Sequence, residues 1–274
     1  MSIKMIAFDM DGTLLNADHV TIPEENISAL RAARERGIKI AAATGRTWCL
    51  IDSAVEPLGG VDYAVTSNGA AVLEPGSRRW LYTRTIPNDK SLALIALLKR
   101  WNLPFEIYCE GQNYMEKSCL PLMPKTLLSE MFTDYYDKIT AFVDSLEEAL
   151  AGRPMEKIDI FYVPPEHRES VIREVQKLLP AQIAHAAAEN MEITAADVTK
   201  GAALAQLCGE LGILPEEVMA FGDGNNDVEM LRWAGLSFAM ENGSDDAKAV
   251  AGAVAPANHL GGIGQMVRKY ILEA

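Results

Sequence analysis

The amino-acid sequence predicts an α/β protein, in which a domain built on a parallel β-sheet is interrupted by an inserted α+β domain. Short apolar runs alternate with helical patterns through the N-terminal part of the chain, which is typical of β-α-β units. This pattern changes at residue 83 and resumes at residue 195. A chain of 274 residues is also longer than most chains that fold around a single hydrophobic core. We therefore expect residues 1–82 and 195–274 to form the sheet domain and residues 83–194 to form the insertion.

Local signals divide the sheet domain into strands and helices. Thr21 and Glu24 have the spacing of a capping box, which predicts the start of the first helix, and Gly37 predicts its end. Asn68-Gly69 is a tight-turn signal between two strands. The expected strands cover residues 5–8, 38–43, 63–67, 70–73 and 218–221, and a helix is expected at residues 200–211. In the insertion, we expect helices at residues 91–101 and 166–179 and a strand at residues 157–163.

Composition and charge restrict the possible partners. The 38 acidic residues outnumber the 25 Lys and Arg residues, giving a formal net charge of -13, so that a nucleic acid would meet overall repulsion. No apolar stretch has the length of a membrane span, and the N-terminus runs directly into a strand pattern, which predicts a cytoplasmic protein with no membrane partner. A small phosphorylated substrate is compatible with the negative charge, because a bound cation and a few basic side chains reverse the potential locally. The sequence does not indicate an oligomeric state.

Polar residues follow the expected strands at the points where these strands end. Asp9 and Asp11 follow the first strand. Thr44 follows the second strand, and Asp223 follows the strand at residues 218–221. The carboxyl ends of parallel strands lie at one edge of a sheet, where ligands bind in folds of this type. We therefore expect these side chains, although distant in sequence, to converge on one site.

Two carboxylates lie close together after the first strand, in the run DMDGT at residues 9–13. Like charges at short distance are unfavourable unless a cation lies between them or one acid keeps its proton, and both arrangements suit phosphoryl transfer. Alternatively, the run is a solvent-exposed acidic loop that has no functional role. An EF-hand calcium loop is excluded, because Leu14 stands where that loop needs glycine.

Three further segments carry polar groups suited to a phosphate or a metal. Thr44 and Gly45 offer a hydroxyl and backbone N–H groups, although a helix N-cap is an equally good interpretation of Thr44. Lys200 offers a positive charge for a phosphoryl oxygen, or is a solvated surface lysine. The run GDGNND at residues 222–227 contains hard oxygen ligands suited to Mg²⁺. Asp227 stands at the third glycine position of a dinucleotide-binding loop and argues against that motif.

Taken in order, these segments resemble the haloacid dehalogenase superfamily of hydrolases. The runs that resemble its Cof-type phosphatase branch are ATGR (43–46), SNG (67–69), KGAAL (200–204) and GDGNND (222–227). The resemblance implies a Rossmann-like parallel-sheet core domain at residues 1–82 and 195–274, and a C2-type cap domain of α+β structure at residues 83–194. One difference is Glu241, where such relatives often carry glycine.

The resemblance also implies a role for each matching residue. Asp9 is the expected nucleophile and a metal ligand. Asp11 is the expected general acid and base, with its backbone carbonyl on the metal. Asp223 would complete the metal site, with Asp227 in it or beside it, and the expected cofactor is Mg²⁺. The residues expected to hold the transferring phosphoryl group are Met10, Thr44, Gly45, Lys200 and Asn226.

The implied function is a Mg²⁺-dependent phosphatase that acts through an aspartyl-phosphate on Asp9. Its substrate would be a small phosphorylated metabolite, such as a sugar phosphate, a nucleotide or a phosphorylated cofactor. Two alternatives remain open. A phosphosugar mutase on the same scaffold would pass the phosphoryl group to a second hydroxyl and would require a sugar bisphosphate. A non-catalytic phosphometabolite sensor would keep the fold without needing the full set of acidic residues and Lys200.

Overall fold

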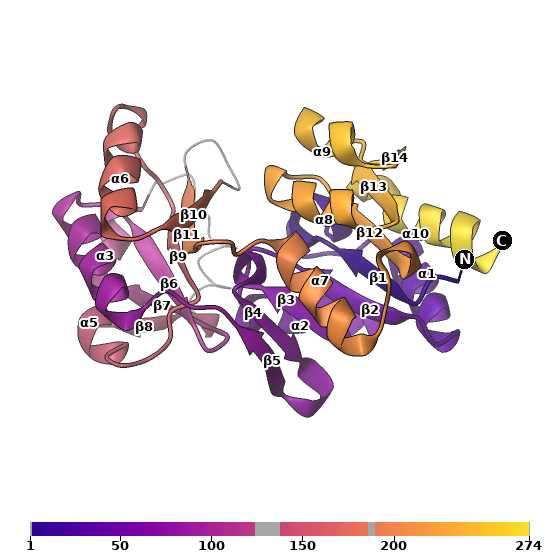
Figure 1. Cartoon of the computed structure of the whole chain (residues 1–274), viewed down its shortest axis with the longest axis horizontal. Coiled ribbons are helices and arrows are strands. Elements are labelled where there is room, and N and C mark those ends of the chain that lie inside the picture. The colour runs from indigo at the N-terminus through magenta and orange to yellow at the C-terminus, as the bar shows by residue number, and fades with distance from the viewer. Residues whose placement is uncertain (1, 124–137, 186–189, 274) are drawn as a thin grey trace. The chain divides into compact units, whose positions relative to one another are not determined.

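The computed structural model of the chain describes residues 2–123, 138–185 and 190–273 (Figure 1). The chain divides into two compact units. The first, the sheet domain, comprises Met1–Arg46, Ile51–Thr83 and Thr199–Ala274. The second, the insert domain, comprises Thr47–Leu50 and Arg84–Val198. Within the described ranges, no helix is long and apolar enough to cross a membrane.

In the described residues, the sheet domain is built on an 8-stranded sheet with the order β14-β13-β12-β1-β2-β3-β4-β5 (Figure 1). The strands are β1 (Met5–Phe8), β2 (Lys39–Ala43), β3 (Tyr63–Thr66), β4 (Ala71–Glu74), β5 (Arg79–Thr83), β12 (Val218–Gly222), β13 (Leu236–Met240) and β14 (Ala253–Ala255). The strands from β14 to β3 are parallel, whereas β4 and β5 add antiparallel beside β3. The predicted first strand therefore lies inside the sheet, between β12 and β2.

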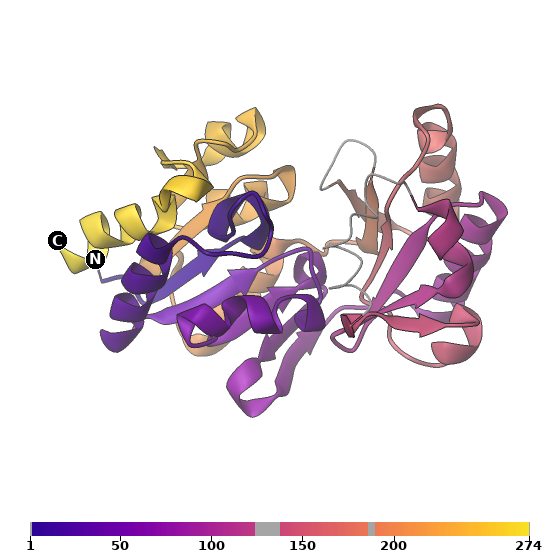
Figure 2. The same cartoon turned by 180° about the vertical axis from the view of Figure 1, so that it is seen from behind.

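Helices cover both faces of this sheet, as the opposite views of Figures 1 and 2 show. The helices of the domain are α1 (Glu24–Glu35), α2 (Asp52–Val55), α7 (Lys200–Leu211), α8 (Val228–Trp233), α9 (Asp245–Val250) and α10 (Gly262–Val267). On one face, α7 packs beside α8, and α8 packs beside α9. On the other face, α1 packs against α10. Covering helices on both faces are the usual arrangement of a parallel sheet.

The side chains of β1 show why both faces need cover. Met5 and Ala7 belong to a buried core that includes Leu204 of α7. Ile6 and Phe8 are also fully buried, and successive side chains of a strand point to opposite faces. A strand of four buried apolar residues is stable only inside a sheet with helices on both sides, which is what the apolar run predicted.

The first helix begins differently from the prediction. α1 begins at Glu24 after Pro23, and no side chain caps its first turn, so the predicted capping box at Thr21 is wrong. Thr21 instead binds Asp18: its backbone N–H and its hydroxyl donate to the Asp18 carboxylate at 2.8 Å and 2.6 Å. These hydrogen bonds keep the segment before α1 in a compact loop.

The predicted turn at Asn68-Gly69 is confirmed. β3 and β4 pair antiparallel across it, and Asn68 and Gly69 have φ angles of 58° and 101°. Glycine is required at the second position for a further reason, because a Cβ there would lie 2.3 Å from the carbonyl oxygen of Thr199. The turn therefore lets α7 start close to the end of β3.

In the described residues, the insert domain contains a 6-stranded sheet with the order β10-β11-β9-β6-β7-β8. Its strands are β6 (Phe105–Cys109), β7 (Gln112–Glu116), β8 (Ala141–Val143), β9 (Lys157–Ile160), β10 (Ala181–Ala184) and β11 (Met191–Ala195). Its helices are α3 (Asn88–Arg100), α5 (Leu146–Ala149) and α6 (Pro165–Leu178). One face of the sheet packs apolar side chains, such as Ile107 and Ile158, against these helices. The alternate positions carry buried polar side chains, namely Glu106, Tyr108, Lys157, Asp159 and Glu192.

Several predicted boundaries in the insert domain are shifted, those of α6 by only one residue at each end. The helix expected at residues 91–101 is α3 and begins earlier, at Asn88, and the strand expected at residues 157–163 is β9 and ends at Ile160. The predicted fold class is confirmed, since the chain has a parallel-sheet α/β core and an inserted α+β domain with its own sheet.

Candidate active site

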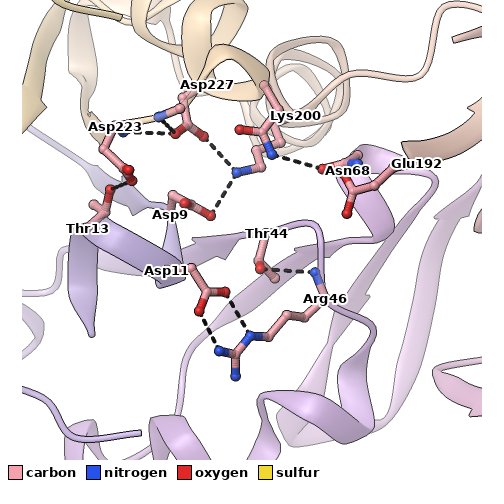
Figure 3. A network of polar contacts seen from close by, with 12 residues as sticks. Asp9, Asp11, Thr13, Thr44, Arg46, Asn68, Glu192, Lys200, Asp223 and Asp227 are labelled. Carbon is pink, nitrogen blue, oxygen red and sulfur yellow. Dashed lines mark hydrogen bonds and ion pairs between the residues drawn. The ribbon is translucent and has the colours of Figure 1, made fainter. Parts of the chain in front are cut away.

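Three strands of the sheet domain end at the same edge and bring predicted site residues together (Figure 3). β1 pairs in parallel with both β12 and β2. Asp9 directly follows β1, and its backbone N–H continues the ladder by donating to the Phe221 carbonyl at 3.0 Å. Thr44 follows β2 and Asp223 follows β12. The convergence that the strand ends predicted is therefore present in the structure.

The turn after Asp9 fits closely over Asp223. Gly12 has a φ angle of 76°, and a Cβ at this position would lie 2.4 Å from Oδ2 of Asp223. The Thr13 hydroxyl donates to Oδ1 of the same carboxylate at 2.6 Å. Only glycine permits both this backbone conformation and this approach. The DMDGT run therefore orients Asp223 as well as supplying its own carboxylates.

Lys200 is fully buried at the first position of α7. Its Nζ donates to Oδ1 of Asp9 and to Oδ1 of Asp227, both at 2.7 Å (Figure 3). Burial alone would lower the pKa of Lys200, but the two carboxylates outweigh burial and raise this pKa. The lysine is therefore held as a cation, and the alternative of a solvated surface lysine is wrong.

Both oxygens of Asp227 accept hydrogen bonds from the protein. Oδ1 faces Lys200, and Oδ2 accepts from the backbone N–H groups of Asp223 and Gly224, both at 2.9 Å. The Asp227 side chain is fully buried. It therefore links the loop after β12 to Lys200 and fixes the backbone from which the Asp223 carboxylate projects.

A group of carboxylates at this edge suits a divalent cation. Carboxylate oxygens of Asp9, Asp223 and Asp227 lie within 4.8 Å of one another. Burial raises the pKa of Asp9 well above its usual value, and the neighbouring carboxylates add to this effect, although Lys200 opposes it. Burial is also the main reason that the pKa of Asp223 is raised to about 6. The three acids exceed the charge of one ammonium, so the donor set fits Mg²⁺, which prefers oxygen ligands.

The Asp11 side chain has a different set of partners. Arg46 Nε donates to Oδ2 of Asp11 at 2.8 Å, and Arg46 Nη2 donates to Oδ1 (Figure 3). His19 Nδ1 lies 2.8 Å from Oδ1. Burial would raise the pKa of Asp11, but the hydrogen bond with His19 and the Arg46 charge outweigh it and lower this pKa. The two aspartates of the DMDGT run are thus held by separate basic groups.

Thr44 is buried, and its hydroxyl accepts a hydrogen bond from the backbone N–H of Arg46 at 3.1 Å. The chain after it forms a short helical turn at Trp48–Leu50, and the next α-helix is α2. Thr44 therefore stabilises the turn that follows β2 and does not cap an α-helix, so the prediction of a helix start at this point is wrong.

The remaining predicted phosphate-binding residues lie after β1, β2 and β12. Met10 is fully buried, and Gly45 is half-buried. The side-chain amide of Asn226 donates to Oδ1 of Asn68 at 3.2 Å, which connects the GDGNND run to the turn after β3. All of these residues belong to the sheet domain.

The structure adds Asn242, which the sequence alone did not single out. Its Nδ2 donates to the Gly12 carbonyl at 2.8 Å, and its Oδ1 accepts from the Asn258 backbone N–H at 2.9 Å. The neighbouring Glu241, which differs from the residue common in relatives, is exposed. Asn242 follows β13, so the same attention to strand ends could have found it.

Comparison with known proteins agrees with this geometry. The family model of haloacid dehalogenase-like hydrolases matches residues 6–267. The chain is 30% identical to Phosphatase YwpJ of Bacillus subtilis, covering 97% of this chain and 99% of that protein. It is also 30% identical to the 5-amino-6-(5-phospho-D-ribitylamino)uracil phosphatase YcsE of the same organism, covering 99% of this chain and 97% of that protein. A solved haloacid dehalogenase-like hydrolase from B. subtilis matches with a TM-score of 0.84 at 28% identity, covering 98% of this chain and 100% of that chain. The chain therefore belongs to the haloacid dehalogenase-like hydrolases and is a phosphatase of their Cof-type branch.

Proposed function

We propose that the protein hydrolyses small phosphate monoesters in a Mg²⁺-dependent reaction through a phosphoryl group carried on Asp9. The observation that carries this proposal is the position of Asp9. It is a buried carboxylate at a strand end, in contact with the Lys200 ammonium and within 4.8 Å of two other carboxylates. Because Lys200 engages Oδ1 of Asp9, we assign the attack on phosphorus to Oδ2.

The reaction consists of two displacements at phosphorus. In the first, an oxygen of Asp9 forms a bond to phosphorus, the bond from phosphorus to the ester oxygen breaks, and Asp11 gives that oxygen a proton. In the second, Asp11 takes a proton from water while the water oxygen bonds to phosphorus, and the bond from phosphorus to Asp9 breaks. Inorganic phosphate leaves and Asp9 is a carboxylate again. Lys200 stabilises negative charge beside Asp9 throughout.

Asp9 and Asp223 are proposed to hold the metal, together with the backbone carbonyl of Asp11. Bound Mg²⁺ would reduce the negative charge on Asp9, so that a carboxylate can approach a phosphate. Asp227 acts beside this site, because both of its oxygens already accept hydrogen bonds from Lys200 and the backbone. The residues proposed to bind the transferring phosphoryl group are Met10, Thr44, Gly45, Lys200 and Asn226.

The proposed substrate is a small phosphorylated metabolite: a sugar phosphate, a nucleotide or a phosphorylated cofactor. Because the relative YcsE is named for a phosphoribityl compound, phosphorylated polyols and their conjugates are the first compounds to test. Phosphate release from a panel of such compounds, with Mg²⁺ and after removal of metal by a chelator, tests the proposal. We expect turnover only when Mg²⁺ is present. We expect that turnover does not require added sugar bisphosphate. A bisphosphate requirement would indicate a mutase instead.

Calcium is expected to inhibit the enzyme in competition with Mg²⁺ and to support a rate at least about tenfold lower. Calcium accepts more oxygen ligands than Mg²⁺ and readily takes both oxygens of one carboxylate, which would occupy the attacking oxygen of Asp9. Phosphate release by metal-free enzyme with Mg²⁺, with Ca²⁺ and with both ions measures this effect. Comparable rates with either ion would mean that Asp9 is not both metal ligand and nucleophile.

Gly12→Ala is expected to lower kcat/KM by about 10²-fold, because the added Cβ would displace the Asp223 carboxylate. We also expect a destabilisation of roughly 1–3 kcal/mol, since alanine is strained at a positive φ angle. Kinetics and thermal unfolding measure the two effects. Gly76→Ala is the control, because among the described residues only its own chain neighbours come within 4 Å of a Cβ built there. Equal activity of the two variants would show that this turn does not position Asp223.

A further inference from the structure

Close to the proposed nucleophile, the residues Asp11, Arg46 and His19 contact one another within the sheet domain. The Arg46 guanidinium binds both oxygens of the Asp11 carboxylate, with Nε at 2.8 Å from Oδ2 and Nη2 on Oδ1. His19 Nδ1 lies 2.8 Å from Oδ1 of Asp11. The backbone carbonyl of His19 accepts a hydrogen bond from Arg46 Nη2 at 3.3 Å. Each residue of this triad therefore contacts the other two.

The loop before α1 holds His19 in a defined conformation. The Asp18 carboxylate accepts from the backbone N–H groups of Val20 and Thr21, at 2.9 Å and 2.8 Å. The Asn16 N–H donates to the Thr21 carbonyl at 2.8 Å, and the His19 N–H donates to the Asn16 carbonyl at 3.0 Å. His19 itself has a φ angle of 58°, which is uncommon for a residue with a side chain. The loop thus keeps a strained residue whose largely exposed ring reaches Asp11.

These contacts lower the pKa of Asp11, as described above, and they also fix the orientation of its carboxylate. An ion pair that is partly open to solvent, as the Arg46–Asp11 pair is, contributes little to stability. Two parallel N–H donors of one guanidinium, however, fix the plane of a carboxylate, which a single contact does not. A free aspartate samples three staggered χ1 positions, and these contacts select one of them.

We propose that Arg46 and His19 are positioning residues for Asp11, which hold its carboxyl group in the orientation used to protonate the leaving ester oxygen. This inference rests on the proposed role of Asp11 as general acid and base. Neither Arg46 nor His19 is assigned a contact with the phosphoryl group. The proposal therefore concerns the leaving-group step and not substrate binding.

The test compares two substrates, an alkyl phosphate and a nitrophenyl phosphate, whose acidic leaving group needs little protonation. For the alkyl phosphate, we expect kcat/KM to fall by about 10²-fold in Arg46→Gln and by about tenfold in His19→Gln. For the nitrophenyl phosphate, we expect kcat/KM to stay within about threefold of the parent. The ratio kcat/KM reports only the steps up to departure of the leaving group, so the later hydrolysis, in which Asp11 acts as a base for both substrates, does not enter it. Equal losses for both substrates would overturn the proposal, because they would indicate a role in phosphate binding or in folding.

Combination with Asp11→Asn separates this proposal from the proposed function. If Asp11→Asn lowers kcat/KM equally for both substrates, Asp11 is not the general acid, and that part of the proposed function is wrong. If Asp11→Asn affects mainly the alkyl phosphate and neither Arg46→Gln nor His19→Gln does, only the positioning role fails. If the proposal is right, adding either substitution to Asp11→Asn costs less than about a further twofold, since the residues act as one unit.

Two controls match these variants. Arg36→Gln removes an arginine that donates to the backbone carbonyls of Ile271 and Leu272, at 2.6 Å and 2.9 Å, and His259→Gln removes an exposed histidine. Both should keep the parent's activity on both substrates. Thermal unfolding shows whether Arg46→Gln is folded. If it is not, His19→Gln decides the question, because a largely exposed side chain can be replaced without loss of packing.

Discussion

Asp9→Asn is expected to abolish turnover, with kcat at least about 10⁴-fold below that of the parent at saturating Mg²⁺ and substrate. An amide has no negative oxygen to attack phosphorus, and it is a poor ligand for Mg²⁺. Asparagine has nearly the same size as aspartate, and its oxygen can still accept the hydrogen bond that Lys200 donates to Oδ1 at 2.7 Å. The fold should therefore survive the change.

Phosphate release and thermal unfolding, measured on the same preparation, check both parts of this expectation. Asp246→Asn is the matched control, because Asp246 is exposed in the first turn of α9 and has no place in the proposed site. Turnover of the Asp9→Asn protein within about tenfold of the parent would remove Asp9 from the mechanism.

The second large effect is expected at Lys200. Lys200→Met keeps most of the side-chain length but removes the ammonium that contacts Asp9 and Asp227. We expect kcat to fall by about 10³-fold, because a preorganised charge beside the reacting group is lost. The free energy of unfolding of the metal-free protein should fall by roughly 3–5 kcal/mol, since two buried carboxylates lose their common partner.

Lys4→Met is the control for this variant. Lys4 pairs with Glu217 at 2.8 Å and is about half exposed, so its loss should cost less than about 1 kcal/mol and leave kcat unchanged. Denaturant unfolding and steady-state kinetics on both variants supply the measurements. A Lys200→Met protein with the activity and stability of Lys4→Met would show that the buried ammonium is not required.

The elements that the sequence predicted most accurately are those defined by local signals. The strand at residues 5–8 and the helix at residues 200–211 have the predicted limits, because an apolar run marks the strand and Gly212 ends the helix in a left-handed conformation. The capping box before α1 failed for a physical reason. The Thr21 hydroxyl has a competing partner three residues earlier, in Asp18, and this local loop is favoured over the helix cap.

The site was predictable as far as it depends on topology. Parallel strands bring their carboxyl ends to one edge, so Asp9, Thr44 and Asp223 could be grouped from the chain order alone. The burial of Lys200 could not be predicted in this way, because it depends on how closely α7 approaches β1. The contact of His19 with Asp11 could not be predicted from the sequence either, since the loop conformation that creates it involves hydrogen bonds among several nearby residues.

In the insert domain, too, the sequence does not predict which polar side chains come together. Glu106, Lys157 and Asp159 alternate with apolar residues on their strands, and the sequence of each strand by itself does not reveal that they share a face. The register of β6 with β9 pairs Glu106 with Asp159, and the Lys157 Nζ lies 3.1 Å from Oδ2 of Asp159. This polar face emerges only when the strands are paired.

Transfer of a phosphoryl group to Asp9 can be detected by trapping that group on the protein. Enzyme turning over a radioactively labelled substrate with Mg²⁺ is quenched in acid, treated with borohydride and digested for mass spectrometry. Borohydride reduces an acyl phosphate to an alcohol, so a phosphorylated aspartate is converted to homoserine, whereas other aspartates are not. We expect label bound to the acid-quenched protein and absent from Asp9→Asn, and we expect homoserine at position 9 after the borohydride treatment. Label on another side chain, or homoserine at a different aspartate, would contradict this mechanism.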